Sequence, residues 1–138
     1  MMVTKQGDGS YSLSVSREYL ESPEDIYSLI RDGKLFRLTG ADTLTFEFIE
    51  GAPFELRFTH GGAIRGRIIE LIPNSKILLE WDVEGFGRLP ERGTEVCITI
   101  SRGASQTRMT IEHNCNPTEQ SANAKRGAWT EILSELMS

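Results

Sequence analysis

The stretch Lys76-Ile77-Leu78-Leu79-Glu80-Trp81-Asp82-Val83 decides the fold, because apolar side chains at every second position alternate with mostly polar ones. A period of two puts one set of side chains on one face of a β-strand. One dry and one wet face are typical of an antiparallel sheet that packs against a single layer. The stretch therefore predicts a strand in such a sheet.

The same period continues from Thr43 to Cys115, and turn residues interrupt it repeatedly. This division predicts six strands in meander order. Their expected apolar faces are Leu44/Phe46/Phe48, Phe54/Leu56/Phe58, Ile64/Ile68, Ile77/Leu79/Trp81/Val83, Val96/Ile98/Ile100 and Met109/Ile111. A further strand is predicted by the strict alternation of residues 11–16. The sheet is thus expected to have about seven strands.

The register of the last hairpin follows from its turn. Gly103 and Ala104 suit a two-residue turn with glycine first. That turn pairs Val96 with Ile111 and places the apolar residues of both strands on one shared face. The two strands are therefore expected to pack their apolar faces against the same layer.

The same register keeps the two cysteines apart. Cys97 is expected to face Thr110, and Cys115 lies about five residues further along, which is roughly 16 Å at the rise of a strand. A disulfide cannot span that distance. We therefore predict two reduced thiols.

Two short helices are predicted between the first strand and the meander. Ser22 is a suitable cap and Pro23 a suitable first residue for a helix that runs to about residue 30. Its buried side is expected to carry Ile26, Leu29 and Ile30. A second, weaker helical stretch covers residues 35–38.

A long helix is predicted at the C-terminal end. Asn116 is the expected cap, with Pro117 at the first position and Glu119 reaching back. One face carries the apolar side chains Ala122, Trp129, Ile132, Leu133, Leu136 and Met137. The side chains of Lys125, Glu131 and Glu135 are expected to stay in solvent.

This order of elements predicts an α+β helix-grip fold, in which a curved antiparallel sheet surrounds the long C-terminal helix. It resembles the START-like superfamily, also called birch-pollen-allergen-like or SRPBCC. Residues 66–73 and 76–81 resemble the Gly-x-Val-x-Glu-Ile-x-Pro and Leu-x-x-x-Trp signature of the family related to the activator of heat shock protein 90 ATPase. Residues 107–113 and 127–133 resemble further motifs of that AHSA-like family.

Two segments depart from the family pattern. Members often carry tryptophan where the second helix ends, and this chain has residues 35–39 without one. The usual Gly-Gly before the third strand is Gly51-Ala52 here. Both departures lie where the entrance of a cavity is expected.

The composition and charge of the chain argue against two classes of binding partner. The 138 residues carry a formal net charge of −5 without a cluster of Lys or Arg, which argues against nucleic acid and against a membrane surface. The chain has no run of 18 apolar residues and no secretory signal, so a cytoplasmic location is expected. Residues 1–9 are expected to be a flexible N-terminus, and residues 10–138 a single START-like domain.

The expected ligand site is an apolar cavity between the sheet and the C-terminal helix. The candidate ligand-binding residues are Phe46, Phe48, Phe58, Trp81, His113, Trp129 and Leu133. Core packing explains the aromatic residues equally well, and a measured void separates the two interpretations. The glycine-rich loop of residues 85–93 is either a plain connection or a flap over the cavity.

The role of His113 has a structural and a catalytic interpretation. His113 shares the inward face of its strand, and a hydrogen bond to a neighbouring hydroxyl such as that of Thr94 is favoured over proton exchange with a ligand. His60 is expected to be exposed in a turn. With two histidines and no Cys-x-x-Cys spacing, we predict neither a metal site nor a cofactor, and we assign no catalytic residue.

Three functions remain open from the sequence. The leading hypothesis is a binding domain for a hydrophobic or amphipathic small molecule. The second, which the family resemblance implies, is a protein-interaction module that contacts a chaperone or a second copy of the chain. The third is an enzyme that uses His113 for acid and base chemistry with a tyrosine such as Tyr11 or Tyr19.

Overall fold

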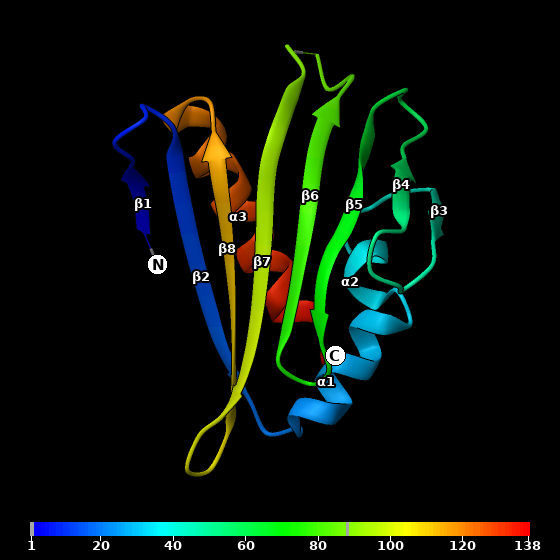
Figure 1. Cartoon of the computed structure of the whole chain (residues 1–138), viewed down its shortest axis with the longest axis vertical. Coiled ribbons are helices and arrows are strands. Elements are labelled where there is room, and N and C mark those ends of the chain that lie inside the picture. Colours follow the sequence, from blue (N-terminus) through cyan, green and yellow to red (C-terminus); the bar gives the residue numbers. More distant parts are fainter. Residues whose placement is uncertain (1, 88) are drawn as a thin grey trace.

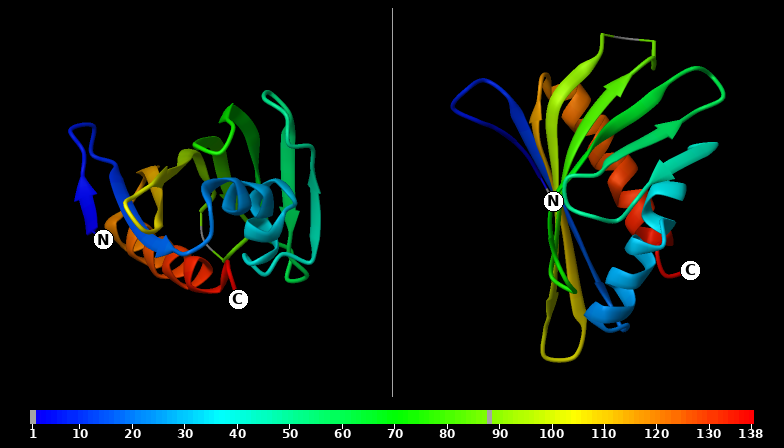
Figure 2. Two further views of the ribbon diagram at one scale, coloured as in Figure 1. Left: turned by 90° about the horizontal axis from the view of Figure 1, so that it is seen from below. Right: turned by 45° about the vertical axis from the view of Figure 1, so that its right-hand side comes forward.

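A long C-terminal helix lies across one face of a curved antiparallel sheet, and two short helices cover the far part of that face (Figures 1 and 2). The computed structural model describes residues 2–87 and 89–138. The elements in chain order are β1 (Met2–Lys5), β2 (Tyr11–Tyr19), α1 (Pro23–Arg31), α2 (Lys34–Arg37), β3 (Thr43–Phe46), β4 (Pro53–Arg57), β5 (Ala63–Ile72), β6 (Lys76–Glu84), β7 (Glu91–Arg102), β8 (Thr107–Asn116) and α3 (Glu119–Glu135).

The sheet has the strand order β1-β2-β8-β7-β6-β5-β4-β3, so β3 to β8 form a meander and β2 joins it beside β8. The predicted α+β helix-grip fold is confirmed, with eight strands instead of about seven. The additional strand is β1, which pairs with β2 in the segment expected to be a flexible N-terminus. Its four residues are too short for a periodic signal to show in the sequence.

The predicted register of the last hairpin is wrong by two residues. Val96 pairs with His113 and Ile98 with Ile111, because the connection is longer than two residues. The N–H of Gly103 donates to the carbonyl oxygen of Gln106 over 2.7 Å and closes this longer turn. A shift of two preserves the alternation of faces, so the shared apolar face remains.

The prediction of two free thiols still holds with the corrected register. Cys97 faces Glu112 instead of Thr110. Cys97 and Cys115 are free thiols, as predicted.

The start of α1 agrees with the prediction, whereas the start of α3 does not. Ser22 caps α1 by accepting from the N–H of Asp25 over 3.1 Å. The cap of α3 is Thr118, whose Oγ1 accepts from the N–H of Ser121 over 3.0 Å. Asn116 is not the cap, because β8 runs through it and its side chain bonds within the sheet.

An aromatic cluster fills the interior between α2 and the sheet. Phe36 is fully buried, and its ring stacks on that of Phe54 with centroids 5.3 Å apart and lies 6.5 Å from that of Trp81. The ring of Phe46 meets Phe36 edge-on at 5.3 Å. This end of the concave face is therefore filled by side chains.

No helix among the described residues is both long enough and apolar enough to cross a bilayer.

Candidate functional site

A cavity of about 440 Å³ lies beside the aromatic cluster, between the sheet and α3. Its lining comes from β5, β6, β8 and α3, from the segments after α2 and β4, and from the loop that follows β6. A volume of this size is ordinary for a site that encloses a small molecule. A pocket of the size that the sequence could not measure is thus present, and it is open to solvent on one side.

Four of the seven candidate residues line the cavity, namely Phe58, Trp81, His113 and Trp129. The other three, Phe46, Phe48 and Leu133, are not among the lining residues.

These three side chains have other partners. Phe46 packs on Phe36, and Phe48 packs edge-on against Tyr27 of α1 at 5.5 Å, because the short helices cover that end of the sheet. Leu133 belongs to the buried core next to Tyr19, whose hydroxyl donates to the Leu133 carbonyl over 2.6 Å. Burial raises the pKa of Tyr19 to about 12.

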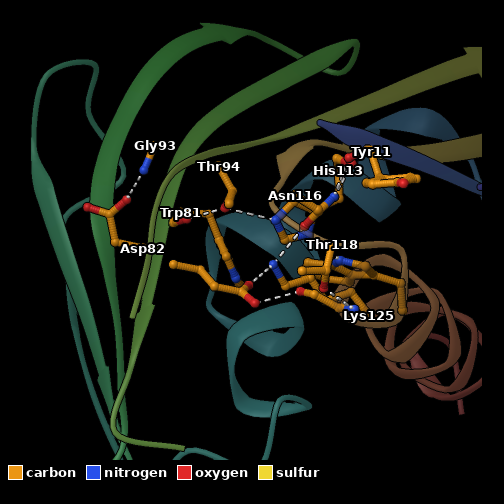
Figure 3. A network of polar contacts seen from close by, with 12 residues as sticks. Tyr11, Trp81, Asp82, Gly93, Thr94, His113, Asn116, Thr118 and Lys125 are labelled. Carbon is orange, nitrogen blue, oxygen red and sulfur yellow. Dashed lines mark hydrogen bonds and ion pairs between the residues drawn. The ribbon is translucent and has the colours of Figure 1, made fainter. Parts of the chain in front are cut away.

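His113 lies at the inner end of the cavity in a chain of hydrogen bonds (Figure 3). The indole N–H of Trp129 donates to its Nδ1 over 3.0 Å, so Nδ1 carries no proton. Nε2 is then the protonated nitrogen, and it donates to Oγ1 of Thr94 over 3.0 Å. The hydroxyl of Thr94 in turn donates a hydrogen bond to the carbonyl oxygen of Trp81. The favoured structural interpretation, with Thr94 as the partner, is confirmed.

The catalytic interpretation of His113 finds no support in this geometry. Both ring nitrogens are engaged in hydrogen bonds within the protein. Burial, with a further contribution from the Lys125 ammonium, holds the pKa of His113 well below its ordinary value of about 6.5. The hydroxyl of Tyr19 is also engaged, by Leu133.

The buried neutral imidazole makes stability depend on pH. The unfolded chain binds a proton near pH 6.5 and the folded chain does not, so the free energy of unfolding is largest above that pH and falls below it. Between pH 6.5 and 5 the His113→Gln variant should avoid up to about 1.6 kcal/mol of the loss that the wild type shows. Urea unfolding at both pH values measures this difference.

The exposed His60 provides the matched control, since His60→Gln leaves His113 intact and should keep the wild-type loss. An independent readout is the nitrogen NMR spectrum of the wild-type His113 ring. It should still report the Nε2–H tautomer at pH 5, and a charged ring at that pH would contradict the assignment.

A second buried polar group surrounds Lys125, which was expected in solvent and is instead only 9% exposed. Its ammonium pairs with the Glu91 carboxylate and donates to Oδ1 of Asn116 over 2.7 Å. Glu91 also accepts from the Ser121 hydroxyl over 2.7 Å. Asn116 donates to the backbone carbonyls of Tyr11 and His113, each over 2.9 Å. We call Glu91, Asn116, Ser121 and Lys125 the lysine cluster.

Two β-bulges bring the lysine cluster into the interior. In β7, Gly93 has a φ of 73° at the bulge against β6, and the inward face continues at Glu91 instead of one residue later. In β8, Cys115 has a φ of 65° at the bulge against β2, and Asn116 takes the inward position. A bulge adds one residue and so reverses the alternation of side chains beyond it.

The rings of Phe58 and Phe86 line the cavity, and the exposed His60 packs against both of them. The ring of Phe86 lies edge-on to Phe58 at 5.1 Å and to His60 at 4.9 Å. A Cβ on Gly62 would approach these rings to within 2.5–2.9 Å, so glycine permits the contact. Phe86 belongs to the loop that the sequence analysis considered as a flap, and Arg88 of that loop lies outside the described residues.

Within residues 2–87 and 89–138, no group of three or more His, Cys, Asp or Glu side chains is arranged to hold a metal ion.

Comparison with known proteins assigns the family. A family model described as "Activator of Hsp90 ATPase homolog 1-like protein" matches residues 21–138. The chain belongs to this activator family. A curated relative from Dictyostelium discoideum, "Activator of 90 kDa heat shock protein ATPase homolog", is 31% identical over 127 residues. The match covers 91% of this chain and 32% of the relative, so the chain spans about a third of that protein's length.

Solved structures show the same fold as this activator-family chain. The Aha1 dimer from Colwellia psychrerythraea matches with a TM-score of 0.71 and 22% identity, over 91% of this chain and 92% of that one. CalU16 from Micromonospora echinospora matches with a TM-score of 0.73 and 19% identity, over 96% and 78% of the two chains. The helix-grip fold is thereby confirmed.

The structure gives physical roles to the signature residues of the activator family. A Cβ on Gly66 would lie 1.8 Å from the carbonyl oxygen of Glu80, so the two strands approach too closely for any side chain. Trp81 forms the cavity floor, with its ring 5.3 Å from that of Trp129. Phe36, near the usual tryptophan position of the family, also stacks on Trp81, with ring centroids 6.5 Å apart.

Proposed function

We propose that this activator-family chain is a binding domain for an amphipathic small molecule, held in the cavity between the sheet and α3. The observation that carries the proposal is a void of about 440 Å³ lined by the rings of Phe58, Trp81, Phe86 and Trp129. The space opens to solvent on one side, because its lining includes exposed residues of α3 such as Ala124 and Glu131. An aromatic lining around such a space supports uptake of an apolar body.

The rigidity of the floor supports the same proposal. Trp81 and Trp129 are 4% and 3% exposed, and the Trp129 indole is fixed by its bond to His113. A preformed site spares a ligand the cost of ordering the side chains that it contacts. The floor is therefore suited to binding without rearrangement.

Blocking the cavity tests the proposal. Ala128 is an exposed residue of α3 that lines the cavity, so Ala128→Trp should fill the space without disturbing the core. We expect the variant to bind the uncharged probe 2-(1-naphthyl)ethanol at least about tenfold more weakly than the wild type, by isothermal titration calorimetry. Native mass spectrometry of the purified protein would additionally reveal a retained ligand.

The matched control is Asn123→Trp, which adds the same side chain at an exposed position of α3 that is not among the lining residues. It should bind the probe like the wild type. Equal binding by the wild type, Ala128→Trp and Asn123→Trp would contradict the cavity as the binding site.

A chaperone-associated role is the second candidate, and family membership is the observation that favours it. The relative that carries the activator name is about three times longer, so its activity comes to this chain only as a proposal. Addition of the purified chain to an Hsp90-type ATPase tests the role. Unchanged ATP turnover would count against it.

A further inference from the structure

We propose that the cavity selects amphipathic molecules with a positively charged head, such as an amine, and holds them with the apolar body inward and the head at the mouth beside Glu131 and Glu135. This inference rests on the proposed function and adds the charge and the orientation of the ligand.

The inner end of the cavity offers little to a polar head. The N–H of Trp129 is used by His113, Nε2–H of His113 by Thr94, and the hydroxyl of Thr94 by a backbone carbonyl. Among the described residues, no buried side-chain nitrogen or oxygen lacks a hydrogen-bond partner. A polar group inserted there would displace one of these bonds and leave a buried group unsatisfied. The inner end therefore favours an apolar body.

The charged groups of the lining have a clear arrangement. Glu131 and Glu135 line the cavity from the last turns of α3, four residues apart on one face, and both are exposed. Of the described lining residues, Lys125 alone carries a permanent positive charge, and its ammonium is paired with Glu91 in the interior. Among the described lining residues, the charge that is exposed to solvent is thus negative.

The basic side chains of α2, the helix just before the lining segment 38–40, are not among the residues that line the cavity. Lys34 donates to the Ser138 carbonyl over 3.1 Å, and Arg37 donates to the Asp32 carbonyl over 3.0 Å. Aromatic rings add to the preference, because the cavity-lining rings of Phe58 and Phe86 can attract a cation. Carboxylates and ring faces together favour a cationic head over an anionic one.

Three probes with one apolar body and different heads test the inference. They are 2-(1-naphthyl)ethylamine, 2-(1-naphthyl)ethanol and 1-naphthaleneacetic acid, which are cationic, neutral and anionic at pH 7. We expect the amine to bind the wild type about fivefold more tightly than the alcohol, and the acid to bind most weakly. Isothermal titration calorimetry at low ionic strength measures all three, and added salt should reduce the preference.

The Glu131→Gln/Glu135→Gln variant should lose the preference for the amine and keep the affinity for the alcohol. The control Glu112→Gln/Glu119→Gln removes an equal number of negative charges at exposed positions outside the lining. It should retain the preference for the amine. Equal binding of the three probes, or a preference for the acid, would overturn the charge inference and leave the proposed function intact. Binding of none of them would overturn both.

Discussion

Replacing Lys125 by methionine is expected to lower the free energy of unfolding by about 3–5 kcal/mol. Methionine matches the length of the lysine stem and removes its charge. The Glu91 carboxylate, which is 6% exposed, would remain buried without the ammonium that pairs with it. Asn116 would also lose the donor to its Oδ1. Urea unfolding at pH 7 measures the loss, as a shift of the midpoint at constant slope.

The double variant Glu91→Gln/Lys125→Met separates the charge from the packing. An amide at position 91 leaves no buried charge, so the double variant should recover a large part of the stability lost by Lys125→Met alone. Lys5→Met, at an exposed position of β1, should change stability by no more than about 0.5 kcal/mol. If Lys125→Met were as stable as Lys5→Met, the lysine cluster would have no energetic role.

Replacing Gly66 by alanine is expected to cost at least about 3 kcal/mol, which is large for the addition of one methyl group. The new Cβ would lie 1.8 Å from the carbonyl oxygen of Glu80 and 3.0 Å from the ring of Phe54. A backbone oxygen in a paired strand cannot rotate away, so β5 and β6 must separate at that point. Thermal unfolding by circular dichroism reports the change.

Gly127 is the matched glycine, because it lies within α3 and a Cβ there would meet nothing within 4 Å. Gly127→Ala should stabilise the protein by about 0.5–1 kcal/mol, since alanine restricts the unfolded chain and favours the helix. The two glycine substitutions thus have opposite expected signs. A mild effect of Gly66→Ala would show that the strands can adjust.

Much of the fold could be predicted because its strands expose one face and bury the other. In β6, buried residues alternate with half-buried ones along the whole strand, as the period of two requires. The first helix was equally readable, because Ser22 and Pro23 are specific signals for a helix start. The register of the last hairpin could not be predicted in this way, since the length of its turn depends on one hydrogen bond between Gly103 and Gln106.

The candidate site was predicted only in part, because counting alternation fails beyond a bulge. Glu91 and Asn116 appear to face solvent when residues are counted from the middle of their strands, and the bulges bring them inside. The glycine at position 93, inside a strand pattern, was a signal for the first bulge. The burial of Lys125 could also have been predicted, because it lies three residues after Ala122 and four before Trp129, on the buried face of the helix.

The lysine cluster also determines the position of α3 along its own axis relative to the sheet. An apolar helix face of Ala, Trp, Ile and Leu can slide past a smooth apolar sheet by one turn, about 5.4 Å, and still bury similar area. A buried ammonium cannot slide in this way, because only one position gives Lys125 both Glu91 and Asn116. We infer that this polar contact fixes the position of α3 along its axis. It thereby holds Ala128 and Trp129 where they line the cavity.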